Sequence, residues 1–192
     1  MRRGETTIDA AQHAGWSGNS PNEDREMTDT YGLNDFVAEV RANIATPRPP
    51  ATVLKALAPG FGCLLANRTF VRQRIDEIGA ESDEVCLHAE PDDGFVVLAR
   101  GFSQKKTGQG TSHAVMPHDH GPLWALYGLY DGSINVQRWE PDESQQSGPF
   151  PGLRLLSERL AGAGDVDMVE PHNMPLPRHV PGSGSSIIVV YD

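Results

Sequence analysis

Residues 116–132 read MPHDHGPLWALYGLYDG, and this stretch decides what fold and chemistry we expect of the chain. In an extended segment, residues i and i+2 point to the same side. His118 and His120 would therefore present both imidazole rings on one face, while Asp119 points away. Two neutral imidazoles placed in this way suit iron, zinc, copper, nickel or manganese. Surface histidines ahead of a strand would give the same pattern, so the surrounding residues decide between the two interpretations.

Strand-like runs surround this pair of histidines. A glycine follows His120, an apolar run begins at Leu123, and Asp131-Gly132 is typical of a two-residue hairpin turn. Further short apolar runs, separated by turn clusters rich in Pro, Gly and Asp, lie at 85–89, 94–99, 134–139, 166–169 and 187–191. Many short strands with no helices between them predict an antiparallel sandwich or barrel.

Helical patterns precede the strands. One amphipathic pattern covers 33–44, with Asn34 as its expected N-cap. A shorter pattern covers 52–57 and is expected to end before Pro59, and a third covers 67–79. The chain is therefore expected to be α+β, with the β part dominant.

The expected organisation has three parts. Residues 1–30 are rich in Gly, Ser, Asn, Asp and Glu, a composition that cannot offset the entropy lost on ordering. We therefore expect a disordered leader over 1–30, a helical preface packed on the barrel over 31–80, and the β-barrel itself over 81–192.

Composition and charge exclude several classes of partner. The 192 residues carry a formal net charge of -10, which repels nucleic-acid phosphates and anionic membranes. No run approaches the roughly 20 apolar residues of a spanning helix, and no apolar stretch follows Arg2 and Arg3 as a signal peptide would require. Cys63 and Cys86 cannot form a disulfide framework, which suits a reducing compartment. The sequence predicts a cytoplasmic monomer or homodimer without nucleic-acid or membrane partners.

A His-x-His pair, followed by a strand and by a glycine that closes a hairpin, resembles the first motif of the cupin superfamily. Most cupins carry a Glu four or five residues after the second His, where this chain has Trp124 and Ala125. The stretch HDHGPLWALYG is similar to the signature of bacterial relatives in the cysteine dioxygenase-like branch, whose members hold iron with three histidines. The resemblance implies a double-stranded β-helix barrel with His118 and His120 as iron ligands. It covers roughly 33–192 in layout, but only 116–132 is specific.

The resemblance also implies a third histidine ligand on the strand after a turn similar to Gly164-Asp165-Val166. His172 lies closest to the expected place, and His179 is the alternative. We favour His172, because the short spacing between His179 and the final strand counts against His179. Each of them could instead be a solvent-exposed loop histidine, and for His179 we prefer that interpretation.

Near the C-terminus, Tyr191 matches the tyrosine that lies beside the iron in cysteine dioxygenases. The resemblance therefore implies that Tyr191 is a catalytic residue that donates a hydrogen bond or a proton. Ile187 and Val189 stand where that pattern has Ser and His, and residues 85–89 lack the Arg that grips the substrate carboxylate in those enzymes. These differences count against thiol dioxygenation in particular and leave the metal site unaffected.

Four further residues are candidates for a substrate pocket. Trp124 and Tyr127 could form its wall, or could be ordinary core aromatics. Arg100 could face the barrel interior and bind an acidic substrate, or could lie in solvent at the end of a strand. His88 could reach the pocket, or could lie at the surface near Glu90.

The function that these features predict is that of a metal-dependent cupin enzyme. We expect a non-haem iron dioxygenase that acts on a small metabolite, such as a thiol, with O2 as the second substrate. Fe(II) is the expected metal, with zinc, nickel and manganese as alternatives. A cupin that binds a metal or small molecule without turnover is the second hypothesis. A zinc-type hydrolase or isomerase on the same barrel is the third.

Overall fold

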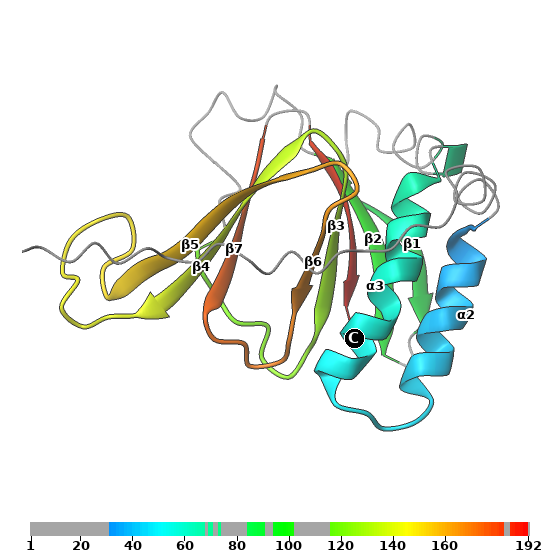
Figure 1. Cartoon of the computed structure of the whole chain (residues 1–192), viewed down its shortest axis with the longest axis horizontal. Coiled ribbons are helices and arrows are strands. Elements are labelled where there is room, and N and C mark those ends of the chain that lie inside the picture. Colours follow the sequence, from blue (N-terminus) through cyan, green and yellow to red (C-terminus); the bar gives the residue numbers. More distant parts are fainter. Residues whose placement is uncertain are drawn as a thin grey trace, which may run out of the picture.

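A computed structural model describes residues 31–67, 69–70, 73, 84–90, 94–101, 116–182 and 185–191 (Figure 1). Over these residues the chain is mainly β, with helices α2 (Leu33–Ile44) and α3 (Pro50–Ala66) ahead of antiparallel strands, as the sequence predicts. The expected leader over 1–30 lies outside the described residues, and so does most of the helix expected over 67–79. Within the described part, no helix is long and apolar enough to cross a membrane.

Helix α2 (Leu33–Ile44) confirms the first amphipathic pattern and buries Phe36, Val37 and Val40. Its N-cap is Gly32 rather than the expected Asn34. The Asp35 carboxylate accepts a 2.8 Å hydrogen bond from the Gly32 N–H. The first turn of the helix is therefore fastened by a side chain inside the helix, where an acidic group also suits the positive end of the helix dipole.

Helix α3 (Pro50–Ala66) is longer than the pattern over 52–57 predicts, because it continues through Pro59. A proline inside a helix removes one backbone hydrogen bond and usually ends or kinks the helix. Here Pro59 lies on the exposed side, where water can satisfy the carbonyl group left without a donor. The apolar stripe continues beyond it with Phe61 and Leu64, both 0% exposed, so packing holds the second half in place.

The strands form two antiparallel sheets. The larger one has the order β1-β2-β8-β3-β6 and the smaller one the order β5-β4-β7. The strand bounds are β1 (Glu84–Glu90), β2 (Phe95–Gly101), β3 (Ala125–Asp131), β4 (Ser133–Pro141), β5 (Leu153–Gly162), β6 (Val166–Val169), β7 (Leu176–Pro181) and β8 (Ser186–Tyr191). Two of these strands, β5 and β7, are absent from the sequence-based prediction.

The turn at Asp131-Gly132 exists, but the expected hairpin is wrong. Strand β3 pairs with β6 and β8, whereas β4 pairs with β5 and β7, so this turn carries the chain from one sheet to the other. Gly132 has φ +82, and a Cβ atom there would lie 2.8 Å from the Cα atom of Ser185. The Ser185 hydroxyl donates to the Ser133 carbonyl at 2.7 Å and accepts from the Ser133 N–H at 3.2 Å. These contacts fix the crossing.

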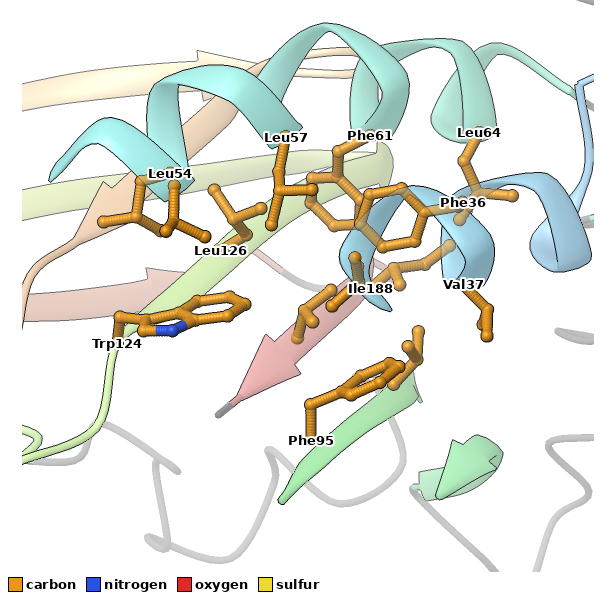
Figure 2. Packing of buried hydrophobic residues seen from close by; sticks show 14 of the residues in the cluster. Phe36, Val37, Leu54, Leu57, Phe61, Leu64, Phe95, Trp124, Leu126 and Ile188 are labelled. Atoms are coloured by element: carbon orange, nitrogen blue, oxygen red, sulfur yellow. The ribbon is translucent and has the colours of Figure 1, made fainter. Parts of the chain in front are cut away.

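The five-stranded sheet has apolar side chains on both faces. One face lies under α2 and α3, where Phe36, Phe61, Leu126 and Ile188 pack together (Figure 2). The opposite face turns toward the three-stranded sheet and forms a second cluster that includes Ala125, Tyr127, Leu129, Ile134, Val136, Val169, Ile187 and Val189. The helices thus cover the outside of the larger sheet, and Tyr127 and Tyr191 belong to its other face.

Candidate functional site

The His-x-His pair lies in the segment that leads into β3, beside strand β7. The His118 backbone N–H donates to the Pro177 carbonyl at 3.3 Å, which holds the segment against β7. The two imidazole rings are stacked, with centroids 5.2 Å apart and planes inclined by 15°. Asp119 is exposed, and its carboxylate accepts from the Gly121 N–H. The predicted arrangement, with both rings on one side and the aspartate away from them, is therefore present.

The hydrogen bonds and the burial of the pair leave both rings suited to a metal ion. Nδ1 of His118 lies 2.8 Å from the Met116 carbonyl oxygen. Because a carbonyl oxygen only accepts, Nδ1 is the donor, and in the neutral form of the ring Nε2 is the nitrogen with the lone pair. Burial, and then the neighbouring rings of His118 and His179, lower the pKa of His120 to about 4. The His120 ring is therefore neutral at pH 7, which is the form that binds metals.

Two tyrosine side chains lie against His120. The Tyr127 hydroxyl oxygen lies 3.2 Å from His120 Nε2 and 3.3 Å from the Tyr191 hydroxyl oxygen. The Tyr191 ring also lies against His120, with centroids 5.9 Å apart. Burial, and then Tyr191, raise the pKa of the Tyr127 phenol, so it stays protonated in the protein without metal. The site therefore brings two nitrogen and two oxygen donors together.

Arg100 lies on the side of the sheet that Tyr191 occupies. On β2, Val96 pairs with Tyr191, and Arg100 is four residues further along the same strand. Its guanidinium carbon lies 6.0 Å from the centroid of the Tyr191 ring, and it forms an ion pair with Glu84. The arginine thus lies at the edge of the site with its charge paired to Glu84.

His179 was expected in a solvent-exposed loop, but it lies on strand β7 with its side chain 10% exposed. Its Nε2 atom lies 2.8 Å from the Asp167 carboxylate, and Arg138 donates to both oxygens of that carboxylate at 2.7 and 2.8 Å. Burial raises the pKa of Asp167, but the hydrogen bonds from His179 and Arg138 outweigh it and lower the pKa to about 2. Sequence reasoning missed Asp167 and Arg138. The available signal was that each is a charged residue inside an apolar run, Arg138 in 134–139 and Asp167 in 166–169.

This ionic network supports one wall of the site. The His179 ring is stacked on the Tyr127 ring, with centroids 4.0 Å apart and planes inclined by 23°. Because Asp167 holds His179, the network fixes the position of Tyr127 and so of its hydroxyl group.

His172 is exposed, has φ +47, and lies in the loop after β6. Its backbone N–H donates to the Gly121 carbonyl at 2.6 Å, so its loop lies beside the loop that carries His120. In the part of the chain that the structure describes, no three His, Cys, Asp or Glu side chains lie close enough together to hold one metal ion. The structure therefore does not gather His172 or His179 with the His118–His120 pair into a three-residue ligand group.

Two of the candidate pocket residues lie elsewhere. Trp124 is 3% exposed and belongs to the cluster under the helices, so the expected role as a pocket wall is wrong (Figure 2). The reason is the alternation of the strand, which sends residues 124 and 127 to opposite faces. The His88 ring packs against Phe95, which is also in the helix-side cluster, and His88 Nε2 lies 3.5 Å from the Glu90 carboxylate. His88 is thus a partly buried residue near Glu90.

The donor set fits a metal ion in part. Two imidazoles suit a transition metal, and a metal bound at Nε2 of His120 would replace the contact of that atom with the Tyr127 hydroxyl. The imidazoles supply only two of the three histidines that the resemblance implies, and the remaining donor atoms close to them are the phenol oxygens of Tyr127 and Tyr191. Whatever the metal, these four side chains and Arg100 define the candidate site.

Comparisons with known proteins find only solved structures of low sequence identity. No family model matches the sequence, and no curated protein matches it. Among solved structures, KdgF from Halomonas sp. is similar over 56% of this chain and 74% of its own, at 13% identity and a TM-score of 0.35. A Cupin 2 conserved barrel domain protein from Salinispora arenicola is similar over 56% of this chain and 72% of its own, at 16% identity and a TM-score of 0.32.

A third solved structure is hydroquinone 1,2-dioxygenase from a Sphingomonas species, with 4-hydroxybenzoate bound. It is similar over 60% of this chain and 68% of its own, at 9% identity and a TM-score of 0.36. None of these TM-scores reaches 0.5, so the similarities alone do not establish the family of this chain.

Proposed function

We propose that this chain is a cupin-type protein that binds a divalent transition metal through His118 and His120 and acts as a non-haem iron dioxygenase on a small metabolite. The observation that carries the proposal is the stacked pair itself. Nδ1 of His118 faces a carbonyl oxygen, which leaves Nε2 of that ring as its metal-binding atom, and the pKa of His120 is lowered to about 4, so the His120 ring is neutral at pH 7. Fe(II) is the proposed metal, with zinc, nickel and manganese as alternatives.

Bound iron would supply the reaction with O2, and the chain would supply orientation, charge and exclusion of water. Arg100 is the residue proposed to bind an anionic group of the substrate, because its guanidinium group lies beside the Tyr191 ring. Tyr191 presents a phenol group next to His120, where it can donate a hydrogen bond to a bound substrate. Buried apolar side chains such as Leu129 and Val189 keep water from the space between the sheets.

A second function, metal or small-molecule binding without turnover, is favoured by one observation. Among the described residues, no third His, Cys, Asp or Glu side chain joins the pair in a group that could hold a metal ion. A barrel with an incomplete ligand set would bind a metal more weakly and would not need to carry out chemistry. Measurement of O2 consumption distinguishes this function from the first one.

The first experiment is elemental analysis of the full chain purified without a polyhistidine tag, before and after anaerobic loading with Fe(II). We expect iron close to one equivalent in the parent protein and its loss in a His118→Ala/His120→Ala double variant. His88→Ala is the matched control, because His88 packs on the helix-facing side of the sheet and should leave the iron content unchanged. Single His172→Ala and His179→Ala variants test the two candidates for a third histidine ligand.

The second step is an O2-uptake screen over small thiols and small carboxylic acids with the loaded protein. Uptake that depends on His118 and His120 supports the dioxygenase. Iron binding without uptake for any compound supports the binding protein. A parent protein that contains no metal and takes up none of the added Fe(II) contradicts both.

A further inference from the structure

We propose that the phenol oxygens of Tyr127 and Tyr191 are themselves metal ligands, so that the site holds ferric iron with two imidazole nitrogens and two phenolate oxygens. This inference rests on one part of the proposed function, the binding of a metal by His118 and His120, and it replaces Fe(II) with ferric ion as the form that is held. It gives both tyrosines a role different from that of a pocket wall or hydrogen-bond donor.

The spacing of the donor atoms is the first argument. Tyr127 Oη lies 3.2 Å from His120 Nε2 and 3.3 Å from Tyr191 Oη. Hydrogen bonds between oxygen atoms are usually about 2.7–2.8 Å long, so this tyrosine pair is too widely spaced for a good one. Ligand atoms on a tetrahedral centre with bonds of about 2.0 Å are about 3.3 Å apart. The separation of the two tyrosine oxygens is thus the one expected of neighbouring ligands around one ion, and that of Tyr127 from His120 fits either a ligand pair or a hydrogen bond.

The second argument is that the rings are held in place by the rest of the structure. Tyr127 on β3 and Tyr191 on β8 reach the same face because Ala125 pairs with Tyr191 and Tyr127 with Val189. His179 is stacked on Tyr127 at 4.0 Å and is fixed in turn by Asp167. A metal site needs ligands whose orientation is set by their surroundings, and such supporting contacts are present here.

The third argument is charge. Among the described residues, no carboxylate joins the histidine pair in a metal-binding group, so the two phenols are the available source of anionic ligands. Two phenolates reduce the charge of a ferric ion to +1. On binding, each oxygen forms a bond to the metal and its proton leaves to solvent. Iron supplied as ferric ion undergoes no change of oxidation state in this step.

The test uses the full chain without a tag, loaded with iron from ferric citrate. Phenolate bound to ferric iron absorbs visible light by charge transfer and gives phenolate vibrations in the resonance Raman spectrum. We expect the parent protein to be coloured and to show these vibrations. Tyr127→Phe and Tyr191→Phe should each weaken the band and lower ferric affinity by at least about tenfold, and the double variant should lose the band. Tyr130→Phe is the matched control, because Tyr130 packs against the helix-side cluster.

Circular dichroism of the metal-free variants shows whether they are folded, and the Raman measurement on the parent needs no variant. Iron that depends on His118 and His120 but gives a colourless protein, with no change in either Phe variant, overturns this inference and leaves the histidine site standing. Failure of the parent to bind iron in either oxidation state overturns the proposed function as well.

Discussion

On β3 and β8, alternate residues point to opposite faces of the five-stranded sheet, and the two sets of side chains differ in kind. Leu126 and Ile188 point toward the helices and join a cluster of aliphatic and aromatic side chains (Figure 2). Tyr127 and Tyr191 point toward the three-stranded sheet, where His120 lies against both of them. The same two strands therefore build a core on one face and a candidate site on the other.

The difference shows that one face of the sheet serves mainly the stability of the fold and the other face carries the candidate site. The helix-side cluster consists of buried apolar groups, whose burial favours folding at about 25 cal/mol per Å². The face between the sheets buries Asp167 and His179, and burial of such groups favours folding only when they are paired. Changes on the first face should act on stability alone, whereas changes on the second face should act on the site and on the response to pH.

The largest loss of stability is expected for Phe61→Ala on the helix side. Phe61 is 0% exposed and its ring packs against Phe36 with centroids 5.2 Å apart, so truncation leaves a cavity. The free energy of unfolding should fall by about 4 kcal/mol, as measured by urea unfolding. The variant should still bind iron at temperatures at which it is folded. Loss of iron binding in the folded variant would show that the two faces are not separable.

A smaller loss, dependent on pH, is expected for Asp167→Asn on the other face. The pKa of Asp167 falls from its ordinary value of 3.8 to about 2 in the folded protein, which corresponds to about 2 kcal/mol of stability. Because the folded pKa is the lower one, this stability is present above pH 4 and is lost as the pH falls toward 2. Urea unfolding of parent and variant across pH 2–7 should therefore converge at the acidic end. A gap that stays constant with pH would contradict this assignment.

The smallest effect is expected for Leu160→Ser on strand β5. Leu160 is 75% exposed, so its removal should change the free energy of unfolding by less than about 0.5 kcal/mol. Leu126→Ala is the matched reference, because Leu126 is 0% exposed and should cost about 3 kcal/mol. Similar losses in the two variants would mean that the outer face of the smaller sheet is covered in solution.

Much of the fold follows from periodicity in the sequence. Alternation and apolar runs predict β1, β2, β3, β4, β6 and β8, and the 3.6-residue pattern predicts α2. Strand β5 is not predicted, for two reasons. Its pairing with β4 is irregular between Arg138 and Trp139 of β4, which breaks the alternation, and nearly all of its side chains are exposed. Strand β7 is not predicted because Pro177 and Pro181 argue against a strand. They are tolerated because β7 lies at the edge of its sheet.

The candidate site was partly predictable for the same reason. His118 and His120 are two residues apart, so local geometry alone places their rings together. The position of His179 depends on strand β7, which the sequence pattern does not predict. The meeting of Tyr127 and Tyr191 depends on the pairing of β3 with β8, and the two residues are 64 positions apart in the sequence. No local pattern carries information about such a contact.

Strand β8 is the last described strand, yet it lies in the middle of the larger sheet, between β2 and β3. During synthesis on the ribosome, β2 and β3 would therefore have no shared neighbour until residues 186–191 emerge. Pairings between segments so distant in the chain raise the contact order and slow folding. The arrival of β8 also brings Tyr191 to His120, so the sheet and the candidate site should be completed in the same late step.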